Sequence, residues 1–264
     1  MSKEIAKVNK EIIIKPDYTG ININSGFVYP PVINILQSDK QFKAFGDEDI
    51  STKSYGKLFV RTDTNSPEDL VETLEGTAIK IEAGHEIRDE QKVIGSGNYM
   101  LGPEEKEDIE QAGHTPVNMI KVLIALGDSK EVLAKMDKYK EKLEKNSATS
   151  NDFPCALLPI KGSSWTSWIE VQEQMESLCQ REYGVSYRDS IASLFKFTIK
   201  SKENYSSKYG KYYSFDLAVE LNDPDEAAEF APLVVAMKDF GLFYKVAEKI
   251  ESKEKEAEKI FEGM

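Results

Sequence analysis

The sequence contains few of the residues that build disulfide frameworks or metal centres, with two cysteines and two histidines among 264 residues. Cys155 and Cys179 lie 24 positions apart, and neither a CxxC nor an HxxxH spacing occurs. Short spacings of this kind are what metal sites in proteins normally show. We therefore expect no structural disulfide, no metal site and no cofactor.

Long apolar runs are also missing. No segment reaches the roughly 18 consecutive apolar residues that a membrane-spanning helix needs. The first residues, MSKEIAKVNKEIIIKP, are charged and lack the apolar centre of a secretory signal. We expect no membrane partner and a cytoplasmic location, or the host cytoplasm if the chain is viral.

Motifs for catalysis are absent as well. The sequence has no GxxxxGK[ST] phosphate loop and no GxSxG nucleophile turn. His85 stands near Glu82, Glu86 and Asp89, which would suit a general base or a metal ligand. A histidine at a strand end among solvated carboxylates is far commoner, so we predict that the protein is not an enzyme.

What the sequence does contain is an uneven distribution of charge. The net charge is -12, yet residues 194–213 carry five lysines against one glutamate. Residues 222–264 carry eleven acidic residues against six lysines. An acidic protein can still bind phosphates, because charges within about 10 Å decide the contact at physiological salt.

The hydrophobic pattern predicts a β-rich α+β fold. Expected strands cover 57–62, 76–87, 117–126, 153–160, 193–205 and 211–221. A helix is predicted from Ser163 or Ser164 to Gly184, with an apolar stripe that includes Trp168 and Ile169. Since crossover helices do not separate the strands, we expect an OB-like antiparallel barrel or curled sheet with an inserted helix and a C-terminal helix.

Three segments follow from this pattern. Residues 1–29 are expected to form an extended N-terminal arm. Residues 30–222 are expected to form the OB-like nucleic-acid-binding domain, and residues 223–264 an acidic helical segment.

The basic segment sorts into two faces when read as a hairpin. Period-two alternation places Phe195, Phe197 and Ile199 on the buried face and the lysines on the outer face. Lysines that neutralise phosphates beside rings that stack on bases are what single-stranded nucleic acid binding requires. The strand at 57–62 repeats the arrangement. The predicted contact residues are Lys57, Phe59, Arg61, Lys80, Lys196, Lys200, Lys202, Tyr205, Lys208, Tyr209, Lys211 and Tyr212.

A plainer interpretation of these lysines stays open. They would then only keep the hairpin soluble and discourage pairing with strands of other molecules.

Three passages resemble the single-stranded DNA-binding proteins of tailed bacteriophages of the OB-fold type: PPVINILQSDK, PCALLPIKGSSWTSWIEV and FKFTIKSKENYSSKYGKYYSFDL. The resemblance implies a non-enzymatic protein that coats single-stranded DNA during DNA replication, recombination and repair. The alternative is a virion structural protein or an assembly or interaction protein, in which the hairpin is a protein contact.

In that family an acidic C-terminal tail often recruits a polymerase or helicase and competes with DNA. The resemblance thus implies replisome proteins as partners of the C-terminal segment. Here the segment mixes lysine with glutamate and is expected to be helical. It would either compete with DNA or dock an apolar stripe of Phe243, Val246 and Ile250 on the barrel.

Overall fold

The computed structural model describes residues 30–37, 45, 52–62, 65–90, 92–207, 210–238 and 240–242. The expected arm at 1–29 and the stripe at 243–250 lie outside these residues. The strands are β1 Val32–Ile35, β2 Leu58–Arg61, β3 Thr73–Asp89, β4 Lys92–Gly97, β5 Thr115–Ala125, β6 Ala156–Ile160, β7 Phe195–Ser206 and β8 Gly210–Leu221. The helices are α2 Pro103–Gln111, α3 Ser129–Glu144, α4 Trp165–Tyr183, α5 Pro224–Glu229 and α6 Ala231–Ala236.

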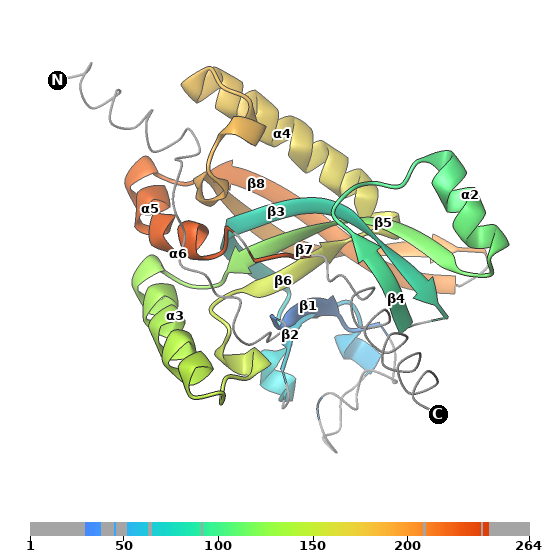
Figure 1. Cartoon of the computed structure of the whole chain (residues 1–264), viewed down its shortest axis with the longest axis horizontal. Helices are drawn as coiled ribbons and strands as arrows, with labels where there is room; N and C mark the ends of the chain where they lie inside the picture. The colour runs from blue at the N-terminus through green and yellow to red at the C-terminus, as the bar shows by residue number, and fades with distance from the viewer. Residues whose placement is uncertain are drawn as a thin grey trace, which may run out of the picture. The chain divides into compact units, whose positions relative to one another are not determined.

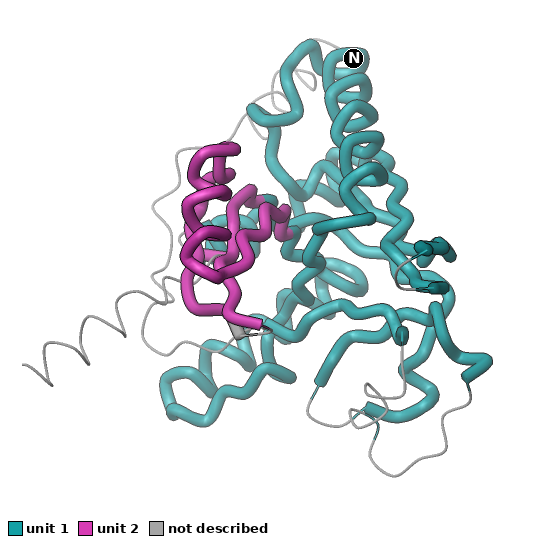
Figure 2. The backbone as a smooth tube through the Cα atoms, turned by 90° about the vertical axis from the view of Figure 1, so that its right-hand side faces the viewer, with its two compact units in different colours: residues 1–81, 122–240 teal, residues 82–121, 241–264 magenta. Residues whose placement is uncertain are grey.

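The chain divides into two compact units (Figure 2). One comprises Met1–Ile81 and Val122–Phe240, and the other Glu82–Lys121 and Gly241–Met264. The expected boundary at residue 222 does not separate the units, because α5 and α6 belong to the first one. Phe230 and Leu233 from these helices are fully buried.

The strands form one mixed sheet in the order β2-β1-β6-β5-β3-β7-β8, with β4 paired to β3. β1 runs parallel to β6, with Val32 opposite Leu157, whereas the β1–β2, β3–β4, β3–β7 and β7–β8 pairs are antiparallel. The expectation of an α+β fold with a curled sheet is confirmed, but the sheet is mixed and not antiparallel throughout, because β1 runs parallel to β6. Within the described ranges no strand pairing joins β2 to β8, so the sheet stays open (Figure 1).

The sheet is strongly curled, and side-chain contacts hold the curl. The side-chain oxygen of Gln37, just after β1, accepts a hydrogen bond from the backbone N–H of Tyr213 on β8 at 3.1 Å. The hydroxyl of Ser201 on β7 donates to the carbonyl of Gly56, just before β2. Gly56 has a φ of +89°, and a Cβ there would lie 2.7 Å from the Tyr213 ring. Only glycine fits this approach without strain.

The β7–β8 hairpin follows the expected register. Phe195, Phe197 and Ile199 are 1%, 0% and 0% exposed and face the core. Phe197 stands opposite Val219 on β8 and Gly76 on β3. The period-two pattern was informative here because one face of this hairpin is buried and the other is solvated.

Helix α4 confirms the predicted inserted helix and lies along β8 (Figure 1). It ends at Gly184, whose φ of +68° is the left-handed conformation common after helices. Trp168, Val171 and Met175 face the core. Ile169 is 44% exposed and does not belong to the stripe, because it lies about 100° around the helix from Trp168.

Both cysteines are free and buried. Cys155 is 3% exposed and Cys179 is 0% exposed. Burial raises the pKa of both thiols, because it disfavours the thiolate.

Candidate nucleic-acid interface

The tip of the β7–β8 hairpin extends beyond its neighbour strand. The pairing of β3 with β7 stops where Thr73 meets Lys200, whereas β7 and β8 pair from Phe195–Leu221 to Ser206–Gly210. Residues 201–206 and 210–214, here called the distal hairpin, therefore have only each other as paired strands among the described residues. Gly56 and Gln37 contact this part of the hairpin at Ser201 and Tyr213, whereas Lys202 and Tyr205 remain exposed.

Close to β3, the lysines are balanced by acidic residues. Lys196 lies 3.7 Å from Glu75 on β3 and 3.7 Å from Glu220 on β8. Asp216 stands directly opposite Lys200. The charge of Lys196 on the expected basic face is therefore compensated, since β3 and β8 supply carboxylates beside it.

Further out, the outer face keeps free cations. Lys202 is exposed and makes no ion pair within the described part of the chain. Lys200 is exposed and makes none there either, although Asp216 stands opposite it on β8. Tyr212 is half-buried on the same face, diagonal to Lys202, since Asn204 opposes Tyr212 and Ser214 opposes Lys202. The Asn204 amide donates to the Ser214 hydroxyl at 2.8 Å, which fixes the middle of this face.

The opposite face of the distal hairpin carries the most exposed ring. Tyr205 is 81% exposed. Its cross-strand partner Lys211 lies 2.7 Å from Glu203 and 5.3 Å from the centre of the Tyr213 ring. The hydrogen bond to Glu203 raises the pKa of Lys211. Lys208 and Tyr209 lie outside the described residues.

The second predicted patch, on β2, is not an aromatic contact surface. Phe59 is 2% exposed, and its ring centre lies 5.0 Å from that of Phe45. Leu58, its neighbour in sequence, is also fully buried, so β2 is covered on both faces and alternation does not identify a solvated one. Lys57 lies 3.6 Å from Glu72, and Arg61 is exposed at the end of the strand.

Lys80 has a structural contact instead of a free ammonium. Its Nζ donates to the carbonyls of Lys238 and Phe240, both at 2.7 Å. It therefore holds the backbone just beyond α6 and is not available to a phosphate in this conformation.

His85 is buried within β3, and Glu86, one of the carboxylates expected to be solvated around it, is buried as well. His85 is 4% exposed, and its Nδ1 is hydrogen-bonded to the carbonyl of Tyr99 at 2.8 Å. The neighbouring Glu86 carboxylate pairs with Lys121 at 2.9 Å and with Arg88 at 2.6 Å. No cluster of three or more metal-ligating side chains occurs among the described residues.

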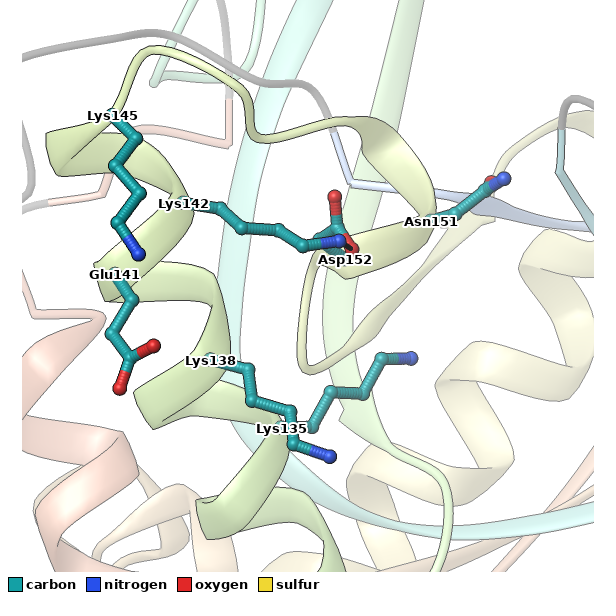
Figure 3. Close-up of a pocket in the computed structure, with 7 residues that line it drawn as sticks. All are labelled: Lys135, Lys138, Glu141, Lys142, Lys145, Asn151 and Asp152. Atoms are coloured by element: carbon teal, nitrogen blue, oxygen red, sulfur yellow. Dashed lines mark hydrogen bonds and ion pairs between the residues drawn. The ribbon is translucent and has the colours of Figure 1, made fainter.

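A basic hollow that the sequence pattern did not predict lies between α3 and the short 3-10 turn η4, Ser150–Asp152. Its volume is about 270 Å³. Figure 3 shows Lys142 reaching from α3 to Asp152 across it. The lining residues are Lys135, Lys138, Glu141, Lys142, Lys145, Asn151 and Asp152. The helical spacing of the lysines could have been recognised in the sequence. That η4 packs close to them is a tertiary contact, which the sequence pattern does not predict.

Comparison of the chain with protein-family models, with curated proteins and with solved structures found no match. Among the described helices, none combines the length and apolar character required to cross a membrane.

Proposed function

We propose that the protein binds single-stranded DNA without catalysing a reaction, in DNA replication, recombination and repair. The observation that carries the proposal is the outer face of the β7–β8 hairpin. There Lys200 and Lys202, which make no ion pair within the described residues, are alternate residues of β7, and Tyr212 stands diagonal to Lys202. Ammonium groups neutralise phosphates, and a ring beside them offers a base a stacking surface. Alternate residues of one strand lie about 7 Å apart, so the two lysines contact successive parts of an extended strand.

An OB-like arrangement is part of this proposal. The strong curl of the sheet and the position of α4 between β6 and β7 support it. Replication proteins are proposed as partners of the C-terminal segment 223–264, on the basis of its eleven acidic residues against six lysines.

Fluorescence anisotropy with labelled oligo(dT), at two salt concentrations and with duplex DNA as a comparison, tests the proposal. We expect the protein to bind the single-stranded oligonucleotide. This binding should weaken as the salt concentration rises, because phosphate contacts release counterions. Duplex should bind more weakly, since its stacked bases do not offer faces to Tyr212. No binding of oligo(dT) at micromolar protein would overturn the proposal.

Charge-neutral variants locate the contact. Lys200→Gln with Lys202→Gln should weaken oligo(dT) binding about tenfold and lower the salt slope by about one for each lost phosphate contact. Lys130→Gln with Lys140→Gln on α3 removes the same charge far from the hairpin in sequence and serves as the matched control. Equal weakening in both variants would show a general charge effect and contradict a contact at the hairpin.

The alternative of an assembly or interaction protein is favoured by one observation, the exposure of Tyr205 on the face opposite to the free lysines. Large exposed rings are enriched in protein contacts. Under this alternative Tyr205→Ala leaves oligo(dT) binding unchanged and lowers the association state in sedimentation velocity. A fall in oligo(dT) binding instead assigns the ring to the DNA contact.

A further inference from the structure

A single stripe of lysines runs along α3. Lys135, Lys138, Lys142 and Lys145 are spaced by three, four and three residues. At 3.6 residues per turn this spacing places all four within one quarter of the circumference. Lys145 is the residue that follows the last turn of the helix. Four ammonium groups on neighbouring turns repel one another, which costs stability unless negative charge lies among them.

The turn η4 forms the other wall of the hollow and fixes one of these lysines. Lys142 donates to the Asp152 carboxylate. The backbone N–H and the hydroxyl of Thr149 donate to the same carboxylate, both at 2.9 Å. The hydrogen bond from Lys142, followed by those from Thr149, lowers the pKa of Asp152, so it stays ionised near neutral pH. Asp152 thus compensates Lys142 and holds it against η4.

The remaining cations of the hollow are not compensated by ion pairs. Lys135, Lys138 and Lys145 make none with any residue that the structure describes, whereas Lys140, elsewhere on α3, lies 3.6 Å from Asp137. Four lysines against Glu141 and Asp152 leave an excess of two positive charges in the lining. This local excess stands out in a chain whose net charge is -12.

We propose that this hollow binds phosphate groups of an anion that carries two or more of them in series. Its volume of about 270 Å³ is just under the lower limit of about 300 Å³ for drug-sized ligands, so it suits a compact anion or a short part of a longer one. No aromatic ring is among its described lining residues, so recognition rests on the phosphates and not on a base.

Isothermal titration calorimetry with sodium triphosphate at low salt and neutral pH tests this site. The wild-type chain should bind triphosphate. Lys135→Gln with Lys138→Gln should weaken binding about tenfold or more, because each lost charge-assisted hydrogen bond contributes that order of affinity. Lys142 and Asp152 are left intact in this variant, so the link between α3 and η4 is preserved.

Lys130→Gln with Lys140→Gln is the matched control, since it removes the same charge from the same helix outside the hollow. It should bind triphosphate within about twofold of wild type, because exposed charges at a distance are largely screened. Absence of triphosphate binding to the wild-type chain, or equal loss in both variants, overturns the proposal.

Two further titrations identify the source of the phosphates and test whether triphosphate binding depends on the hairpin. Displacement of triphosphate by oligo(dT) identifies the hollow as a contact for the backbone of nucleic acid, and lack of displacement assigns it to free oligophosphates. Lys200→Gln with Lys202→Gln should leave triphosphate binding unchanged. Failure of the hairpin proposal is thereby distinguishable from failure of this one.

Discussion

The side-chain oxygen of Ser164 accepts a hydrogen bond from the backbone N–H of Phe215 at 2.9 Å. Ser167, one turn further along α4, accepts from the backbone N–H of Leu217 at 2.8 Å. In an antiparallel pair, backbone N–H groups point alternately toward and away from the partner strand. The two serines thus bind donors of β8 that face away from β7 and are buried without a further strand.

Removal of both hydroxyls should destabilise the protein. Ser164→Ala with Ser167→Ala leaves two buried N–H groups without acceptors, at a cost of about 1–3 kcal/mol each. Urea unfolding followed by circular dichroism measures the change. Ser163→Ala, at an exposed neighbouring position, should change the midpoint little. An unchanged midpoint in the double variant would show that water satisfies these donors.

The curl of the sheet should depend on Gly56. Gly56→Ala imposes a positive φ on alanine and places a Cβ 2.7 Å from the Tyr213 ring. Gly113→Ala imposes a similar φ, +84°, with no atom within 4 Å of the new Cβ. The control should lose about 1 kcal/mol, and Gly56→Ala clearly more, in thermal or urea unfolding. Equal losses would mean that the Tyr213 ring moves aside without cost.

The two faces of β7 should respond very differently to truncation. Phe197→Ala is expected to lower the free energy of unfolding by about 3–5 kcal/mol, because Phe197 is fully buried. Lys196→Gln should cost less than about 1 kcal/mol, since its ion pairs with Glu75 and Glu220 are near solvent. Circular dichroism melts of the two variants check this. A reversed order would place the register of β7 one residue off.

The stability of the second compact unit should fall in acid partly through Glu86. Burial raises the pKa of this carboxyl, but the hydrogen bond from Arg88 and the charge of Lys121 lower it below its ordinary value of 4.5. A folded-state pKa below the unfolded value stabilises the fold above about pH 4.5, and this contribution disappears as the pH falls further.

Glu86→Gln tests this directly. It should cost about 3 kcal/mol at pH 7, because the ion pair between Glu86 and the buried Lys121 is lost. Below pH 4.5 its stability should depend less steeply on pH than that of wild type. Urea unfolding at several pH values between 7 and 3 measures both effects, and parallel curves would contradict the assignment to Glu86.

The elements that the sequence predicted best have one buried face and one solvated face. The β7–β8 register and the core of α4 around Trp168 follow from this contrast, because periodicity reports burial on one side only. β2 violates the condition. Leu58 and Phe59 are both buried, so the pattern assigned Phe59 to solvent.

The sequence did not predict which charged residues lie close together in the folded chain. The lysines of β7 form a basic segment when they are read along the chain, but Glu75 reaches Lys196 from β3, a distant part of the sequence. The hollow beside α3 is a second case in which the sequence did not predict a contact between charged residues. Lys142 meets Asp152 only because the chain turns back after the helix. Local patterns do not encode such partners.

The burial of Cys155 and Cys179 has a practical consequence for labelling the protein. Thiolates are the reactive form, and two inaccessible thiols with raised pKa leave the native fold nearly inert to maleimides. A cysteine introduced as Tyr205→Cys or Asn151→Cys would then take up a fluorophore selectively without prior removal of the native pair. The fluorescence of a label at the hairpin or at the hollow can in this way be followed separately, in a chain that carries no other substitution.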